Sequence, residues 1–347
     1  MERWKGSLIT QGTVLTLALA VAGTLMAGCG GSSRPAHGLV LYNGQHVQTT
    51  NALVAAFEKA TGLAVEVRSD DEAVLAAQIV AEGSHSPADV FYTENSPALE
   101  QLQVKHLLAP VPPSTLARSP ARFDSPAGRW VGVSARVSVL VYNTRLLRRS
   151  QLPSSVSQLA GPRWKGRLAL APAETDFQPV VTAVDRAVGS KATVTWLDAL
   201  KANAAGHIYP DNETVTDEVN KGQAAIGVID QYYWYRLRAQ LGPAAMHSAI
   251  ATFAPRDPGY VVDVSGAGVL RSSAHRAAAD RFLAFLASRR AQEIIAHSDS
   301  YEYPIDSGVR TRPGETPFVT LRPDRITVAE LGTGATAVHL LQRAQLL

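Results

Sequence analysis

The chain has 347 residues, of which 46% are hydrophobic and 18% are charged, so it is long enough to form more than one domain with a large core. Its formal net charge is only +3 and it contains no basic run or stripe, which argues against a nucleic-acid partner. Its single cysteine, Cys29, excludes an internal disulfide and a thiolate metal site in the mature fold.

The first residues have the pattern of an export signal. Arg3 and Lys5 precede a mostly apolar stretch over 14–27, which ends in a Gly-Cys pair. The run 25–29 resembles a bacterial lipobox, and this resemblance implies cleavage before Cys29 and acylation of that residue. We therefore predict a protein that is exported and lipid-anchored, at the outer face of the cytoplasmic membrane or in the periplasm. Its predicted leading segments are a signal peptide over 1–28 and a lipidated tether over 29–37.

From residue 39 onward, short apolar runs alternate with stretches of helical periodicity. The pattern predicts strands over 39–42, 63–67 and 88–92, and helices over 50–60 and 72–82. This βαβαβ order is typical of a largely parallel sheet with helices on both faces, whose ligands gather beyond the carboxyl ends of the strands. A binding site is therefore expected in the segments that follow the strands.

A long extended run over 130–142 separates this set from a second one, in which we predict strands over 167–171 and 224–229. The segment 261–270 is again extended. We interpret the two long extended runs as crossings between two lobes of an α/β protein. The predicted lobes are 38–135 with 265–312, and 136–264 with 313–347.

Unusual polar side chains follow strands in both predicted lobes. His46 lies after the first strand and Glu94 after the third, whereas Tyr232 and Tyr233 lie in a predicted loop after 224–229. If each sheet presents its strand ends to one cleft, the imidazole and the carboxylate face the two phenols. Such hard oxygen donors suit a small, highly charged cation, and ferric iron fits best. A phenol has a pKa of about 10, so it ligates as phenolate only when a strong Lewis acid displaces its proton.

Each of these residues also has an ordinary interpretation. A histidine in a loop is often a hydrogen-bonded surface residue, and Glu94 could cap a helix that starts near Ser96. Tyr232 and Tyr233 could be core aromatics with their hydroxyls satisfied locally. The prediction of a metal site therefore depends on the combination of the residues. Zinc is disfavoured, because it prefers histidine and cysteine ligands, and few of these are grouped in the chain.

Two other classes of function compete with a metal-binding protein. The aromatic cluster over 232–235 could enclose an organic cation such as a polyamine through cation–π contacts, and this alternative stays open. An enzyme is disfavoured, because the chain has no nucleophile elbow, no phosphate-binding loop and no His-x-x-x-His pair. The sequence therefore predicts a binding protein.

At these residues the chain resembles the periplasmic ferric-ion-binding proteins of bacterial ABC iron importers, which are extracellular solute-binding proteins often likened to transferrins. The similarity covers nearly the whole mature chain. It is carried by the stretches 41–46 (Leu-Tyr-Asn-Gly-Gln-His), 87–94 (Pro-Ala-Asp-Val-Phe-Tyr-Thr-Glu), 164–166 (Trp-Lys-Gly), 232–235 (Tyr-Tyr-Trp-Tyr) and 257–259 (Asp-Pro-Gly).

The resemblance implies a two-lobed periplasmic-binding-protein fold, a Venus flytrap similar to type II with two crossover hinge strands. It implies that the transported ligand is Fe³⁺, bound by His46, Glu94, Tyr232 and Tyr233. It also implies a monomer that docks on the permease of an iron importer, whose ATPase completes the transporter.

The chain departs from the family pattern on the side of the site where some members bind phosphate or a similar anion. Those members have small or neutral residues where this chain has Glu174 and Asp176, and an asparagine where it has Asp230. Asn212 does match a second asparagine on that side. Because carboxylates repel an anion, we predict that Asp176 or Glu174 completes the coordination, directly or through water, and that no exogenous anion is needed.

Overall fold

The computed structural model of the chain describes residues 38–347, which lie within one compact unit. The predictions for the signal peptide, for Cys29 and for the tether fall outside these residues. Within the described part, no helix is both long and apolar enough to cross a membrane. The lobe boundaries inside this unit remain predictions.

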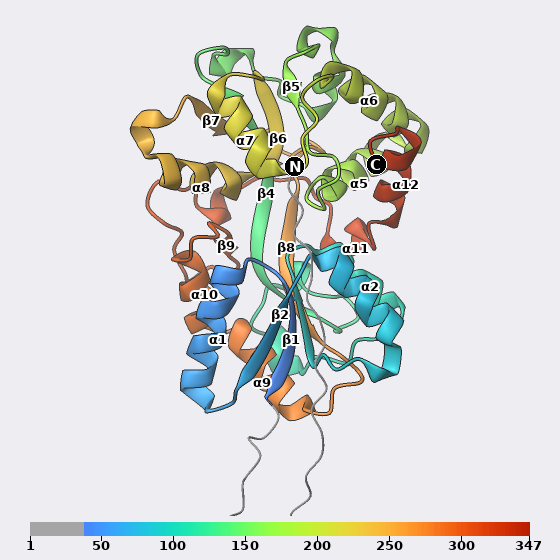
Figure 1. Cartoon of the computed structure of the whole chain (residues 1–347), viewed down its shortest axis with the longest axis vertical. Helices are drawn as coiled ribbons and strands as arrows, with labels where there is room; N and C mark the ends of the chain where they lie inside the picture. Colours follow the sequence, from blue (N-terminus) through green and yellow to red (C-terminus); the bar gives the residue numbers. More distant parts are fainter. Residues whose placement is uncertain (1–37) are drawn as a thin grey trace, which may run out of the picture. The chain divides into compact units, whose positions relative to one another are not determined.

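A continuous path of paired strands runs through the described residues (Figure 1). Its order is β2-β1-β3-β8-β4-β6-β5, with β7 and β9 paired to β4 beside this path. β1 pairs in parallel with β2 and β3, and β5 with β6, whereas β4 and β8 run antiparallel to their neighbours. The strands are β1 Leu39–Gly44, β2 Val65–Ser69, β3 Val90–Thr93, β4 Val131–Asn143, β5 Leu168–Ala169, β6 Ile226–Asp230, β7 Ser248–Ala251, β8 Val262–Val269 and β9 Tyr303–Pro304.

Strand β4 joins the two parts of this sheet, and all of its residues are buried. Its first half, up to Val137, pairs with β8, and its second half, from Ser138, pairs with β6 and β7. Figure 1 shows β4 and β8 running between the part of the sheet that holds β1 to β3 and the part that holds β5 to β7. We refer to these parts as the β1–β3 half and the β5–β7 half.

Helices cover the sheet in both halves (Figure 1). The helices are α1 Val47–Thr61, α2 Glu72–Glu82, α3 Ser96–Val104, α4 Pro113–Leu116, α5 Phe177–Val188, α6 Ser190–Asn203, α7 Asn212–Lys221, α8 Gln231–Leu241, α9 Arg276–Leu286, α10 Arg289–Ala296, α11 Val328–Leu331 and α12 Ala335–Arg343. The predicted helix over 72–82 matches α2 at both ends. Asp71 begins it by accepting hydrogen bonds from the backbone N–H groups of Ala73 and Val74.

Some predicted boundaries differ from the observed ones. The strand predicted over 63–67 is displaced to 65–69, and the one predicted over 167–171 is reduced to Leu168–Ala169. β5 lies at the end of the strand path and pairs only with β6, so its flanking residues lack a continuous ladder. Apolar composition alone does not show how far such a ladder extends, because the extent depends on the partner strand.

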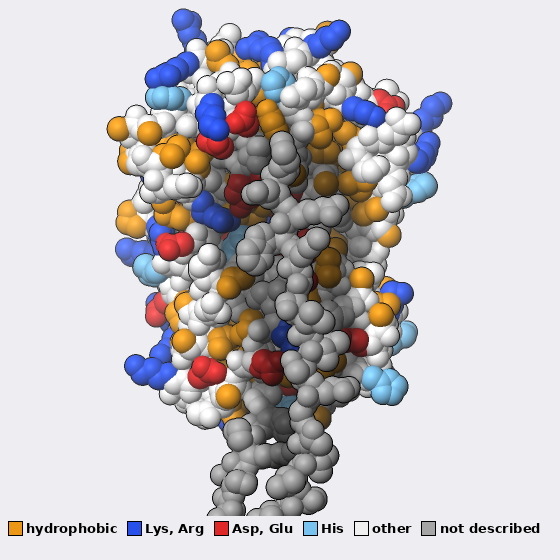
Figure 2. Space-filling view, viewed as in Figure 1, with side chains coloured by type: hydrophobic (Ala, Val, Ile, Leu, Met, Phe, Trp, Pro, Cys, Tyr) orange, Lys and Arg blue, Asp and Glu red, His pale blue; other side chains and the backbone are white. Residues whose placement is uncertain are grey.

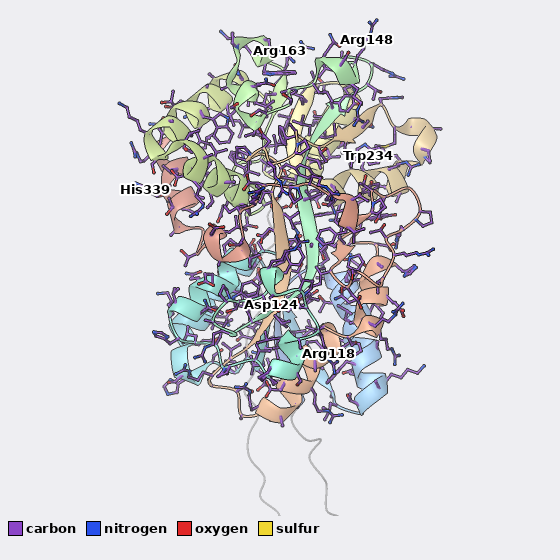
Figure 3. The ribbon with its side chains drawn as sticks, turned by 180° about the vertical axis from the view of Figure 1, so that it is seen from behind. Arg118, Asp124, Arg148, Arg163, Trp234 and His339 are labelled. Carbon is purple, nitrogen blue, oxygen red and sulfur yellow. The ribbon has the colours of Figure 1, made fainter. Side chains whose placement is uncertain are left out.

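Two clusters of buried apolar side chains form the core. One packs α1 and α9 against the β1–β3 half, where the rings of Phe57 and Phe282 meet edge to face with their centroids 5.0 Å apart. The other extends through both halves and includes Trp130 and Trp164. Figure 3, seen from behind, shows side chains filling the space between the ribbons.

The surface carries charges of both signs. On the face in Figure 2, Lys and Arg side chains lie in separate groups with Asp and Glu among them.

Candidate metal-binding site

His46 lies at the carboxyl end of β1, where the chain enters α1. Its backbone N–H donates a hydrogen bond of 2.6 Å to Oε1 of Gln45, and its side chain caps no helix N–H. The imidazole Nε2 is buried, makes no hydrogen bond and lies 3.2 Å from Oε1 of Glu94. Burial, together with the nearby Arg136 guanidinium, lowers the pKa of His46 to about 4. The imidazole is therefore neutral at pH 7, with a nitrogen that can bind a metal.

Glu94 follows β3 and reaches across to the β5–β7 half. Its Oε1 accepts a hydrogen bond of 2.8 Å from the hydroxyl of Tyr232, and it also lies 3.6 Å from Nη2 of Arg136. Burial raises the pKa of Glu94 to about 8 and the carboxylates of Asp176 and Glu302 add to this rise, although Arg136 opposes it. Glu94 is thus mostly protonated at pH 7, and a bound cation would favour its ionised form.

The two tyrosines lie in the first turn of α8, not in the loop that the sequence predicted. β6 ends at Asp230 and α8 begins at the next residue, so Tyr232 and Tyr233 are fixed by helix geometry. Their ring centroids are 4.1 Å apart, and the ring of His46 meets Tyr232 edge-on at 5.1 Å. Burial, and then the charges of Asp176 and Glu94, raise both phenol pKa values well above the usual 10. The hydroxyls are therefore protonated until a Lewis acid displaces the protons.

Asp176 lies at the centre of the contacts between the halves. It precedes α5 but caps no backbone N–H, and its Oδ2 accepts hydrogen bonds from Tyr232 (3.0 Å) and Tyr233 (2.7 Å). Its Oδ1 accepts from the side chain of Asn95 at 3.0 Å, and Asn212 reaches Oδ2 at 3.5 Å. The structure thus brings Asp176 and Asn212 together with the four predicted ligands.

The other two predicted acids lie nearby in different settings. Glu174 lines an open cavity of about 380 Å³ together with His46 and Glu94. Burial, and then the charge of Asp176, raise the pKa of Glu174 to about 8. Asp230 is buried at the end of β6, where burial and Asp176 raise its pKa well above the usual value. Several carboxyl groups therefore face this region, and a highly charged cation would offset their repulsion.

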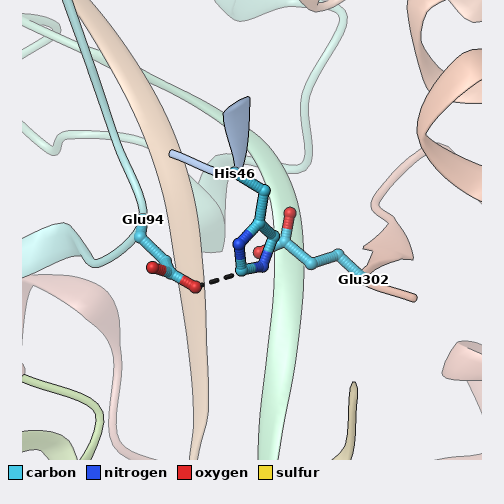
Figure 4. A group of neighbouring side chains, drawn as sticks. All are labelled: His46, Glu94 and Glu302. Atoms are coloured by element: carbon cyan, nitrogen blue, oxygen red, sulfur yellow. Dashed lines mark ion pairs between the residues drawn. The ribbon is translucent and has the colours of Figure 1, made fainter. Parts of the chain in front are cut away.

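Two buried charged residues beside the site were missed from the sequence, Arg136 and Glu302. Nη2 of Arg136 contacts Oε1 of Glu302, and potential ligand atoms of His46, Glu94 and Glu302 all lie within 4.8 Å of one another (Figure 4). Arg136 had a visible signal, because it is a single charge inside the apolar run of β4. Glu302 had none, since only the pairing of distant strands brings it to the site.

The family model of the bacterial extracellular solute-binding proteins matches residues 39–298. The Fe(3+)-binding periplasmic protein of Serratia marcescens is 38% identical over 94% of this chain and 96% of its own length. The crystal structure of iron-bound HitA from Pseudomonas aeruginosa superposes with a TM-score of 0.83 at 39% identity, covering 88% of this chain and 98% of that one. A Trichodesmium protein, IdiA (FutA), in complex with iron and citrate gives a TM-score of 0.79 at 29% identity, covering 89% and 99%.

These matches show that the chain is a bacterial extracellular solute-binding protein. Within this class, it belongs to the family of periplasmic ferric-iron-binding proteins. The predicted resemblance and the predicted periplasmic-binding-protein fold are therefore confirmed, and membership of this family makes the chain a binding protein rather than an enzyme.

Proposed function

We propose that this protein captures ferric iron between its two halves and delivers it to the permease of an ABC importer. The main support is the convergence of two phenols with Glu94, Asp176 and a neutral imidazole on one region, from segments far apart in the sequence. This is a donor set of hard oxygens with one nitrogen, which suits Fe³⁺. The Serratia marcescens relative, whose name specifies Fe(3+), and the iron-bound structure of HitA add to this support.

In the proposed mechanism, iron first binds Tyr232 and Tyr233, which α8 holds side by side. Closure of the halves then adds His46 and Glu94, which belong to the β1–β3 half. Closure is stabilised only by contacts that the closed state makes, such as the one between Asn95 and Asp176. Iron displaces the phenol protons as it binds, so the site exchanges protons for metal.

A visible absorption titration tests this function. Ferric citrate added to the metal-stripped protein should give a saturable phenolate-to-iron charge-transfer band. Spermidine, the matching probe for a polyamine cage, should not bind. Saturable spermidine binding without a band would overturn the iron proposal and support the organic cation.

We also propose that Asp176 takes the place of an exogenous anion in the coordination of iron. Its carboxylate already contacts both phenols and is only 7% exposed, so there is little room and much negative charge where an anion would bind. Glu174 and Asp230 add to that charge, which disfavours phosphate or citrate at this position.

Loading the protein from ferric nitrilotriacetate, followed by gel filtration, distinguishes coordination by Asp176 from coordination by an exogenous anion. The unmodified protein should keep its iron and its band, with no chelator detected by mass spectrometry. Asp176→Asn should weaken retention by at least ~10-fold, with partial recovery on addition of phosphate, whereas the exposed Asp198→Asn should behave like the unmodified protein. A strict requirement of the unmodified protein for phosphate or citrate would refute this role for Asp176.

Attachment to the membrane through Cys29 completes the proposal. The charged, apolar and Gly-Cys order of the first residues supports it. The full-length protein should partition with the membrane fraction, and Cys29→Ser should release it to the soluble exported fraction. Recovery of both forms in the same fraction would contradict the lipid anchor.

A further inference from the structure

The ion pair between Arg136 and Glu302 lies at the junction of the strands that join the two halves. Arg136 is in β4 and Glu302 directly precedes β9, and neither side chain is more than 1% exposed. Nη2 of Arg136 also donates a hydrogen bond of 3.0 Å to Ser265 in β8. The pair therefore links both long strands to the segment before β9.

Glu302 is saturated with hydrogen bonds although it lies close to His46 and Glu94 (Figure 4). Its two carboxylate oxygens accept from the hydroxyls of Ser134 (2.8 Å) and Ser265 (3.0 Å), from the amide of Gln45 (3.1 Å) and from Arg136. Binding a metal through this carboxylate would break several of these contacts at a buried site. Glu302 is thus placed to hold its neighbours in position and not to bind iron itself.

Both ligands of the β1–β3 half are tied to this pair, His46 through the adjacent Gln45 and Glu94 through its own backbone carbonyl and the adjacent Asn95. Gln45 donates to Glu302 through its amide nitrogen, while its amide oxygen accepts from the backbone N–H of His46 at 2.6 Å. Arg136 donates through Nη1 to the backbone carbonyl of Glu94 and, at 3.0 Å, to the side chain of Asn95. One buried pair therefore positions two ligand segments that are 48 residues apart by their numbers, His46 and Glu94.

The same stretch of β4 contacts the helix of the tyrosines. The backbone N–H of Val137, next to Arg136, donates to the side chain of Gln231 at 2.8 Å, and Ser138 pairs with Asp230. Gln231 begins α8 and directly precedes Tyr232. Both ligand sets thus contact one short segment of β4, the tyrosine helix through the backbone of Val137 and Ser138 and the other ligands through the side chain of Arg136.

We propose that the pair of Arg136 and Glu302 keeps His46 and Glu94 aligned with the tyrosines, and so prolongs the retention of bound iron. This inference rests on the proposed function. Its distinctive consequence is kinetic, because α8 holds Tyr232 and Tyr233 in place and neither phenol is hydrogen-bonded to the pair, although the Arg136 guanidinium lies 5.6 Å from the centroid of the Tyr232 ring. Arg136 and Glu302 are positioning residues, which act through Gln45 and the Glu94 segment, and Nη2 of Arg136 also lies 3.6 Å from the carboxylate of Glu94.

Stopped-flow absorption tests the proposal with Arg136→Met, Glu302→Gln and the control Arg276→Met, which removes an ion pair within α9. Band formation with ferric citrate should keep its rate within about twofold, whereas band loss to excess EDTA should be at least ~10-fold faster in both site variants. The control should match the unmodified protein. Unchanged release from a folded Arg136→Met protein would overturn the inference.

A double-mutant cycle with Glu94→Gln separates positioning from general destabilisation. If Arg136 acts through Glu94, then Arg136→Met should speed release much less in the Glu94→Gln background, whereas independent, additive effects would overturn the inference.

If Arg136→Met does not fold because it leaves Glu302 buried without its partner, the Gln45→Leu variant takes its place in the release experiment. Gln45→Leu cuts the link to His46 and leaves the ion pair intact. Release from Gln45→Leu at the rate of the unmodified protein would then refute the inference. If the unmodified protein gives no band, the proposed function itself fails.

Discussion

Replacing Tyr232 by phenylalanine should remove most of the ferric-iron binding and leave the fold intact. The ring stays in the core, and only the hydroxyl that contacts Glu94 (2.8 Å) and Asp176 (3.0 Å) is lost. We expect the affinity to fall by at least ~100-fold, because the loss of an outer-sphere partner of a metal site alone costs ~10–100-fold. The charge-transfer band should be weaker and shifted, since only Tyr233 remains as a phenolate. Absorption titration with ferric citrate measures both effects.

Tyr235→Phe is the matched control for this experiment. Tyr235 lies in the same helix and is also buried, but its ring stacks on Tyr301 at 5.9 Å, and it is not among the predicted ligands. Its removal should leave the band and the affinity unchanged. A full band in Tyr232→Phe, or an equal loss in Tyr235→Phe, would refute phenolate ligation by the predicted pair.

Bound iron should be released as the pH falls. At pH 7 the metal-free protein holds protons on both phenols, whose pKa values are raised well above 10, and mostly on Glu94, whose pKa is about 8. His46, with a pKa of about 4, holds none. Iron binding should therefore release ~three protons, so the affinity should fall by ~1000-fold for each pH unit below 7. The sign follows because the metal binds the deprotonated forms, which acid depletes.

Calorimetry in buffers of different ionisation enthalpy counts the released protons directly. Tyr232→Phe should release about one proton fewer than the unmodified protein, whereas Tyr235→Phe should release the same number. Retention of iron with unchanged affinity down to moderately acid pH would contradict phenolate and carboxylate ligation together.

Much of the architecture could be predicted because its signals are local. The helix over 72–82 has apolar periodicity between an acidic start and Gly83, and the observed α2 has the same bounds. The long extended run over 130–142 corresponds to β4, Val131–Asn143, within one residue at each end. Both patterns depend on side chains within one element, so the sequence contains them in full.

The neighbourhood of the site was also foreseeable, because parallel strands bring their carboxyl ends to one edge. That rule places His46 after β1 and Glu94 after β3, and it puts the tyrosines after β6, although it did not reveal that they belong to a helix. The structure brings these residues into contact, while their role as ligands remains a prediction.

What the sequence determined by itself is the order and type of the elements and the chemical character of the strand ends. Only the tertiary structure decided that Asp176 faces both phenols and that Arg136 meets Glu302, 166 residues further along the chain. The antiparallel pairing of β4 with both β8 and β9 creates this second contact. A buried charge is stable only beside its partners, and which partners it meets depends on strand register over the whole sheet, which no local pattern specifies.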